Sequence, residues 1–203
     1  MEAEAYVALA ARHETPLFTY AARMLGGLHE GERCLIAALT DGWRELDGGA
    51  EPARPQEWFT SLVRERCFDE LARRAPAGPE DDRLGGDCVA VAAHAALAEL
   101  RPAYRDLVLL RDVHGLDTAL LCVVTDMSEA DVENQLYRAR AEFAGLYAFQ
   151  HEPDGCSARR RNCPDCAERE RLRTRPQHAL LHLGPLAVRD QVRDALRSAL
   201  SAP

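Results

Sequence analysis

Apolar residues along most of this chain recur every three or four positions and do not alternate with polar ones. This period predicts helices and almost no β-strand. Glycine and proline interrupt the pattern at Gly26 and Gly27 and again in "LDGGAEPARPQ", so two or three helices are expected before residue 75. The chain is therefore predicted to be all-α.

The same pattern divides the chain into four parts. The stretch "APAGPEDDRLGG" has the proline, glycine and acid content of a connector, and "HEPDGCSARRRNCPDC" separates a second helical block from a tail with two helical stretches. We expect a small helical domain over residues 1–75, a linker over 76–87, a second helical domain over 88–150, and a small helical, cysteine-containing extension over 151–203.

The second block has the spacing of a helix-turn-helix. Pro102 stands where a helix begins, Gly115 where it ends, and Asp126 falls in a tight turn that favours a residue tolerant of positive φ. Ser128 is placed to cap a last helix, whose buried stripe is predicted at Val132, Leu136, Ala139 and Phe143. Two short helices joined in this way fit a DNA major groove, and spacing alone also fits an ordinary helical hairpin.

Composition narrows the classes of function. The chain has 203 residues, 47 % of them hydrophobic, which is enough for real cores. Its net charge of −8 argues against coating nucleic acid through charge alone, and all of its basic residues except histidine are arginines. No nucleophile–base pair, phosphate loop or open metal site stands out, so an enzyme is not expected.

The hydrophobic pattern predicts neither a membrane-spanning segment nor a secretion signal. No apolar run approaches the roughly 20 residues that span a bilayer, and the acidic start "MEAEAYVALAARHE" does not have the layout of a signal peptide. We therefore expect no membrane contact and a cytoplasmic protein with reduced thiols. Four isolated cysteines in apolar helical patterns are predicted to act as small buried hydrophobes, namely Cys34, Cys67, Cys88 and Cys122.

Two collinear stretches resemble extracytoplasmic-function sigma factors of the sigma-70 family. The segment "LRPAYRDLVLLRDVHGLDTALLCVVTDMSEADVENQLYRAR" is similar to their region four, and "LFTYAARMLGG" through "EWFTSLVRERCFDELARR" is similar to their region two. The resemblance implies a non-catalytic initiation factor. Region two would bind the clamp of RNA polymerase and melt the minus-ten element, and region four would read the minus-thirty-five element and contact the polymerase flap.

The resemblance assigns residues to two surfaces. Polymerase binding would fall to Arg33, Ile36, Asp41 and Arg44, although the usual acid and glutamine of the clamp-binding helix are replaced by residues such as Arg33 and Ile36. DNA binding would fall to Asn134, Gln135, Arg138 and Arg140 on the recognition helix and to Arg64, Arg66, Arg73 and Arg74 in region two. Asparagine and glutamine pair with adenine, whereas Glu133 among them opposes phosphate.

The extension contains a cysteine cluster. Cys163 and Cys166 form a CxxC knuckle, Cys156 lies seven residues earlier, and the candidates for a fourth ligand are His151, His178 and His182, of which His178 is preferred. The cluster faintly resembles a zinc-containing anti-sigma domain, with Arg159 where that pattern has histidine. A zinc site, a redox pair and the absence of a ligand role all remain open.

The last stretch, "HALLHLGPLAVRDQVRDALRSAL", is partly amphipathic and would pack back on either domain. The resemblance and the extension together predict a sigma-like initiation factor with a metal- or redox-responsive regulatory tail. Its expected partners are core polymerase, promoter DNA and a protein regulator. The alternative is a degenerate sigma-like protein that acts through protein–protein interaction and does not initiate transcription.

Overall fold

The computed structural model describes residues 2–46, 49, 51–73, 84–149 and 164–201. These residues form helices and contain no β-strand, which confirms the all-α prediction. They divide into two compact units. The first unit draws on residues 1–82, 123–125 and 185–203, and the second on residues 83–122 and 126–184.

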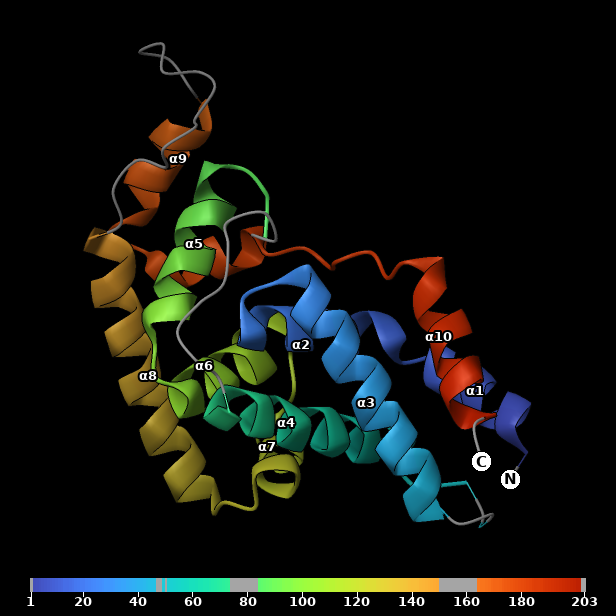
Figure 1. Cartoon of the computed structure of the whole chain (residues 1–203). Helices are drawn as coiled ribbons and strands as arrows, with labels where there is room; N and C mark the ends of the chain where they lie inside the picture. Colours follow the sequence, from blue (N-terminus) through green and yellow to red (C-terminus); the bar gives the residue numbers. More distant parts are fainter. Residues whose placement is uncertain (1, 47–48, 50, 74–83, 150–163, 202–203) are drawn as a thin grey trace. The chain divides into compact units, whose positions relative to one another are not determined.

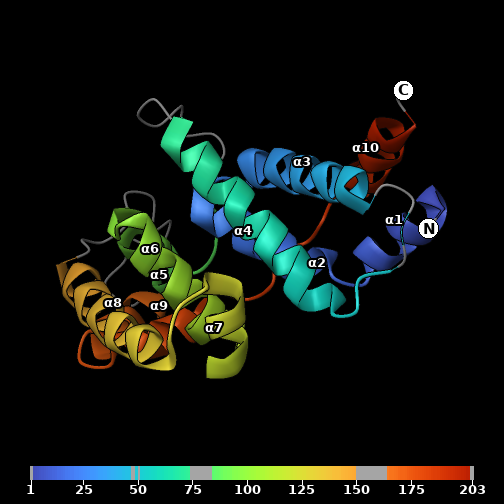
Figure 2. The same ribbon diagram turned by 90° about the horizontal axis from the view of Figure 1, so that it is seen from below.

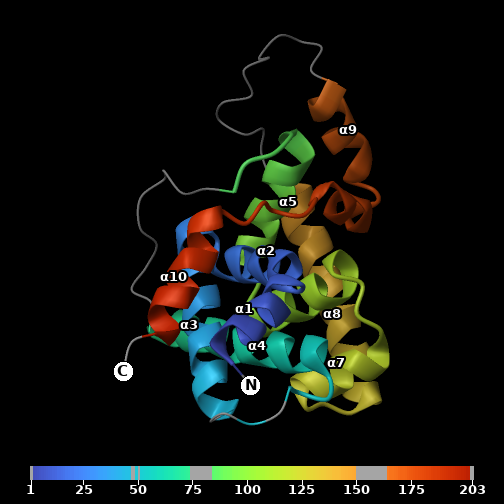
Figure 3. The same ribbon diagram turned by 90° about the vertical axis from the view of Figure 1, so that its right-hand side faces the viewer.

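The first unit is a helical bundle closed by the last helix of the chain. Helix α2 packs on α3 and α4, α3 packs on α4, and α10 lies against α1 and α3 (Figures 1 and 3). The helices are α1 (Ala3–Ala11), α2 (Glu14–Leu25), α3 (Leu28–Leu46), α4 (Pro55–Arg73) and α10 (Asp190–Leu200). Figure 2 shows α3 and α4 side by side in this unit.

An aromatic cluster forms part of the first unit's core. Tyr6 is fully buried between Trp43, Trp58 and Phe59, and its hydroxyl donates a hydrogen bond of 2.6 Å to the carbonyl of Leu39. Burial, with a smaller contribution from Glu45, raises the pKa of Tyr6. The buried hydroxyl is thus satisfied and α1 is tied to α3.

Close approach of α2 and α3 depends on small residues. Gly26 adopts φ +81° and ends α2, a conformation that costs glycine little. A Cβ at Gly31 would come within 2.7 Å of the Ala22 Cα, so the two backbones touch where a larger residue would separate them.

In the second unit, shorter helices pack on one side of α8. Helices α5 and α6 pack on α8, while α9 and the 3-10 segment η3 pack on α5 (Figure 1). The elements are α5 (Cys88–Glu99), α6 (Pro102–Val108), the π-helical turn η2 (Leu109–Val113), α7 (Thr118–Thr125), α8 (Glu129–Phe149), α9 (Pro164–Leu172) and η3 (Pro176–His182). The end of α7, residues 123–125, groups with the first unit.

Local signals in the helix-turn-helix are confirmed. Pro102 begins α6, Asp126 adopts φ 54° at the end of α7, and Gly115 has φ +71°. The Asp131 backbone N–H donates to the Ser128 Oγ at 3.2 Å, which caps α8 as predicted. The short polar side chain at Asp126 tolerates the left-handed conformation that the turn requires.

Buried polar contacts join α5 to α6. The Arg105 guanidinium donates to the carbonyls of Leu97, at 2.7 Å, and Leu100, at 3.1 Å. These carbonyls lie at the end of α5, where few later N–H groups remain to accept from, and the Leu97 carbonyl also accepts a 3.2 Å hydrogen bond from the Leu100 N–H. A side chain of α6 therefore completes the preceding helix.

The described part of the extension is divided between the two units. Residues 164–184 belong to the second unit and residues 185–201 to the first. Leu172, Ala179, Leu180 and Leu183 are buried in the second unit, and Val192 and Leu196 are buried in the first. The extension contributes to both cores. Across the parts of the chain that the structure describes, no helix is both long enough and apolar enough to cross a membrane.

Candidate nucleic-acid interface

The exposed side of α8 carries a short polar strip. Val132, Leu136, Ala139 and Phe143 are buried, as the spacing predicts. The residues that follow Val132 and Leu136 by one or two positions are exposed: Glu133, Asn134, Tyr137 and Arg138. Because residues four apart share a helix face, Asn134 and Arg138 form one row and Glu133 and Tyr137 the next.

Tyr137 was not among the residues selected from the sequence. Its side chain is 76 % exposed, whereas the other tyrosine of α8, Tyr147, is buried and has its pKa raised to about 12 by burial. The exposure of Tyr137 could have been predicted from its position directly after the buried Leu136, because consecutive residues on a helix point about 100° apart. An exposed aromatic beside an amide and a guanidinium suits contact with a base or a thymine methyl group.

The other two candidates on α8 have partners inside the second unit. The Gln135 amide lies 3.5 Å from the Met127 sulfur. Arg140 forms a two-pronged pair with Asp112 of η2, whose Nε–Oδ2 distance is 2.9 Å, and the hydrogen bonds from this guanidinium to Asp112 raise the pKa of Arg140. Arg140 is thus oriented by its own domain.

The acids at the start of α8 differ in their surroundings. Asp131 accepts a hydrogen bond of 2.6 Å from the Ser128 hydroxyl, and Glu129 stands in the first turn, where the helix dipole favours a negative charge. Glu133 lies beyond that first turn in the exposed strip. The charge that opposes phosphate is therefore concentrated at Glu133.

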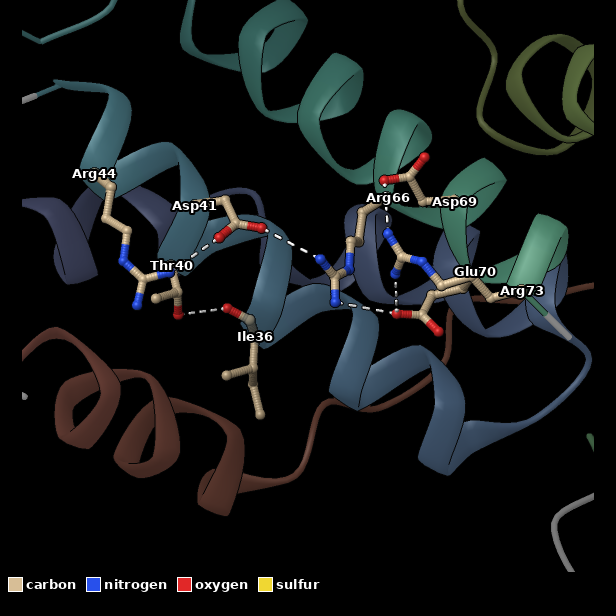
Figure 4. A network of polar contacts seen from close by, with 8 residues as sticks. All are labelled: Ile36, Thr40, Asp41, Arg44, Arg66, Asp69, Glu70 and Arg73. Carbon is tan, nitrogen blue, oxygen red and sulfur yellow. Dashed lines mark hydrogen bonds and ion pairs between the residues drawn. The ribbon is translucent and has the colours of Figure 1, made fainter.

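A second group of candidates lies on α3 and α4 of the first unit (Figure 4). Asp41 pairs with Arg44 at 3.2 Å and with Arg66 at 3.4 Å, and Arg66 continues to Glu70 at 3.1 Å. Arg73 pairs with Glu70 at 3.6 Å and with Asp69 at 3.2 Å. This α3–α4 network brings together residues that the resemblance assigned to polymerase (Asp41, Arg44) and to DNA (Arg66, Arg73).

The α3–α4 network balances its charges. Its three arginines, Arg44, Arg66 and Arg73, face three acids, Asp41, Asp69 and Glu70. Solvent-exposed pairs of this kind contribute about 0–1 kcal/mol each, so an incoming phosphate or acidic side chain can exchange with an existing partner at low cost. The network is a polar surface of no net charge.

The remaining region-two candidates are placed individually. Arg33 is exposed and Ile36 is half-buried, pointing away from α4 in Figure 4 while its carbonyl accepts a 2.7 Å hydrogen bond from Thr40. The Arg64 guanidinium lies over the Phe68 ring, 4.9 Å from its centroid. Arg74 lies outside the described residues.

The cysteine cluster is described only in part. His151, Cys156 and Cys163 lie outside the described residues, and His178 is exposed on η3. The Cys166 sulfur lies 3.5 Å from the Cys88 sulfur, a juxtaposition that the sequence did not suggest. Within the described ranges no three histidine, cysteine or acidic side chains gather as a metal site would need, so zinc stays a prediction.

Helix α10 is held within the first unit by ion pairs as well as by apolar contacts. Three pairs form what we call the arginine ladder: Arg189 with Glu32, Arg193 with Glu14, and Arg197 with Glu4. The arginines lie four residues apart and so share one helix face. The glutamates come from α3, α2 and α1, and hydrogen bonding to Glu14 raises the pKa of Arg193.

The ladder glutamates differ in exposure. The side chain of Glu32 is 7 % exposed and that of Glu14 is 10 % exposed, whereas that of Glu4 is 75 % exposed. A buried carboxylate requires a partner, because an unpaired buried charge is costly. The buried Glu32 and Glu14 therefore depend on Arg189 and Arg193 of the ladder. The exposed Glu4 does not depend on Arg197 in this way.

The helix-turn-helix of the second unit matches a known family of domains. The family model described as "Sigma-70, region 4" matches residues 90–143, which run from α5 to the middle of α8. The second unit therefore contains a sigma-70 region 4 domain. A search among curated proteins finds no match.

Two solved structures share the fold. One is the sigma factor RpoE in complex with the anti-sigma factor NepR from Bartonella quintana, with TM-score 0.55, 13 % identity, and coverage of 70 % of this chain and 96 % of that one. The other is CnrH in complex with the cytosolic domain of CnrY, with TM-score 0.55, 24 % identity, and coverage of 71 % and 88 %. With the region 4 match, this likeness in fold confirms the resemblance to sigma factors.

Proposed function

We propose that the protein is a transcription initiation factor that binds core RNA polymerase and promoter DNA. The observation that carries the proposal is the coincidence of the region 4 match, over residues 90–143, with a helix-turn-helix that exposes a polar strip on α8. A recognition helix placed in this way enters the major groove with its exposed residues toward the bases.

On this proposal Asn134 and Arg138 contact DNA directly. Asparagine pairs with adenine and arginine with guanine or phosphate, and the exposed Tyr137 in the neighbouring row adds apolar contact. Arg140 supports the helix through Asp112. Glu133 weakens attraction to the backbone, so binding depends more on base contacts than on charge.

Polymerase binding is proposed for α3 through Arg33, Ile36, Asp41 and Arg44. Arg33 and Arg44 are exposed, and the half-buried Ile36 offers apolar area beside them. The charge-balanced α3–α4 network would exchange internal partners for groups on polymerase or DNA.

The extension is proposed to regulate the factor. Helix α10 occupies surface on α1 and α3 and is held by the arginine ladder, so a partner that needs this surface must displace it. Both solved relatives are bound to a second protein in their structures, which supports a protein regulator as a partner here. A zinc ion at the cysteine cluster would order the start of this extension.

The central test mixes the purified protein with core RNA polymerase, then measures co-elution and promoter-dependent transcripts. Promoter fragments selected from a random library by the holoenzyme then serve for binding measurements. We expect Arg138→Ala to lower affinity by about 1–3 kcal/mol. Arg171→Ala is the matched control, because Arg171 is an exposed arginine on α9 that pairs with Glu168 one helical turn away. Failure to bind core polymerase would overturn the proposal.

A truncation tests the regulatory role of the extension. Removal of residues 185–203 frees the α10 surface of the first unit, and we expect it to raise binding to core polymerase and run-off transcription. Wild type and truncated protein are compared with and without a chelator. Equal activity in all four samples would remove regulation by the tail.

A second candidate function is a sigma-like protein that acts only through protein–protein interaction. The charge-balanced α3–α4 network and the acids of α8 favour it, because both reduce attraction to nucleic acid. The two functions separate in the same experiment. This second one requires no core-dependent transcripts together with retained binding of a protein partner.

A further inference from the structure

Two thiols from distant parts of the sequence meet in the second unit. Cys88 is the first residue of α5 and Cys166 is the third residue of α9. Their sulfur atoms lie 3.5 Å apart, and neither cysteine is in a disulfide. The contact joins the extension to the helical block that precedes the helix-turn-helix.

We propose that Cys88 and Cys166 form a reversible disulfide that fastens α9 of the extension to α5 when the protein meets a peroxide. This modification site does not depend on whether the protein binds polymerase or DNA. It also differs from a pairing within the Cys163–Cys166 knuckle, because its second thiol comes from the folded domain.

The geometry requires only a small movement. A disulfide bond is about 2.05 Å long, so the sulfurs must approach by about 1.5 Å from their separation of 3.5 Å, a shift within reach of side-chain rotation. Helices α5 and α9 already pack together. Leu172 at the end of α9 is buried, and Arg173 just beyond it donates to the carbonyl of Ala148 at 3.1 Å. The backbone of α9 is thus held in position for the bond.

The two thiols also differ in access to solvent, which gives them different roles. Cys166 is partly exposed, whereas Cys88 is buried at 9 % exposure. Peroxide therefore reaches Cys166 first. Its thiolate attacks the peroxide, so that an S–O bond forms, the O–O bond breaks and hydroxide leaves. The Cys88 thiolate then attacks that sulfur, which forms the S–S bond and releases a second hydroxide. The two thiol protons convert both hydroxides to water.

The first unit contains an internal control. Cys34 and Cys67 also lie with their sulfurs 3.5 Å apart, but they are 2 % and 0 % exposed in the core between α3 and α4. If proximity alone were sufficient, both pairs would oxidise. If access to peroxide is required, only Cys88 and Cys166 will react while the protein is folded.

The test treats the reduced, chelator-washed full-length protein with hydrogen peroxide, alkylates the remaining thiols and maps peptides without reduction. We expect a peptide pair linked through Cys88 and Cys166, with Cys34 and Cys67 alkylated only after unfolding. The linked pair should persist in Cys163→Ser and vanish in Cys166→Ser and in Cys88→Ala. A Cys163–Cys166 linkage in the wild type, or both Cys88 and Cys166 recovered as alkylated thiols, overturns the proposal.

A stability measurement checks the bond without any variant. Linking residues 88 and 166 closes a loop around most of the second unit, so oxidation should raise its Tm by roughly 10 °C and a dithiol reductant should reverse the change. A parallel sample is loaded with zinc before peroxide. If metal blocks oxidation there while the chelated sample still gives the Cys88–Cys166 link, the proposal stands. A chelated sample with neither the link nor the Tm shift refutes it.

Discussion

The two halves of the extension attach to the protein by different means. Residues 164–184 bury Leu172, Ala179, Leu180 and Leu183 in the second unit. Residues 185–201 bury chiefly Val192 and Leu196 in the first unit and add the three ion pairs of the arginine ladder. One half is held mainly by apolar packing, and the other combines a smaller apolar contact with ion pairs.

This difference implies that the halves respond to different conditions. Apolar packing depends weakly on ionic strength, whereas the ladder arginines, whose side chains are 46–48 % exposed, are screened in part as the Debye length falls from about 10 Å at 0.1 M salt to about 3 Å at 1 M. A change in ionic conditions or a charged competitor would release α10 and leave α9 and η3 in place.

The largest effect is expected in the apolar half. Leu180 is 2 % exposed, and Leu180→Ala should lower the unfolding free energy of the second unit by about 2–4 kcal/mol, because a cavity replaces packed methyl groups. Chemical denaturation followed by circular dichroism measures the change. The neighbouring Leu181 is 76 % exposed, and Leu181→Ala should change stability by less than about 0.5 kcal/mol. Equal effects would show that η3 is not packed as described.

The arginine ladder should show a gradient. Arg189→Ala leaves Glu32, whose side chain is 7 % exposed, without its main partner, which should cost about 1–3 kcal/mol in the first unit. Arg197→Ala removes a pair whose glutamate is 75 % exposed and should cost less than about 0.5 kcal/mol. Thermal unfolding of both variants measures the gradient. The reverse order would contradict the burial of Glu32.

Salt should separate the halves without any substitution. Between 0.1 M and 1 M sodium chloride, amide exchange in α10 should accelerate several-fold because the ladder is screened, while exchange in α9 and η3 changes little. Peptide-resolved hydrogen exchange reports both regions in one experiment. Uniform acceleration across the extension would mean that charge does not distinguish its halves.

The smallest effect concerns pH and Asp87, which caps α5 and lies 3.0 Å from the His182 ring at the end of η3. Partial burial acts to raise the pKa of Asp87, but hydrogen bonds from Ala90 and His182 outweigh it and lower this pKa below 3.8. The folded state thus binds this proton less readily than the unfolded one. Its stabilisation is present at neutral pH and is lost as pH falls below about 3.8.

Asp87→Asn retains the cap and removes the charge. It should be slightly less stable than wild type at pH 7, and the difference should shrink as pH falls below about 3.8, as measured by denaturant unfolding at several pH values. Asp87→Ala, which also removes the cap, should lose about 1 kcal/mol at each of them. A difference for Asp87→Asn that persists unchanged in acid would show that the charge is not its cause.

Local features of the fold were predictable because their causes lie within a few residues. The cap at Ser128, the left-handed Asp126, the start of α6 at Pro102 and the buried stripe of α8 all follow from short-range chemistry and a helical period. Exposure of Asn134 and Arg138 follows from the same period.

Long-range pairings were not predictable from pattern. Cys88 sits among apolar residues and was expected to be a buried hydrophobe, which it is, yet its contact with Cys166 depends on how α9 packs. Glu4, Glu14 and Glu32 look like ordinary helix acids, and their arginines lie more than 150 positions away. Periodicity indicates which face of α10 is apolar, but it does not identify the surface that α10 covers.

The arginine ladder also determines which chemistry can reach it. A guanidinium keeps its charge across the pH range in which proteins stay folded and is not a substrate for the acetylation that neutralises lysine. Since the chain contains no lysine at all, neither deprotonation nor acyl transfer to an amine can neutralise the cations that hold α10. Acid can neutralise the glutamates, and a competing cation can capture them. A protein or peptide rich in arginine is thus the kind of molecule that would compete for the three glutamates and displace α10.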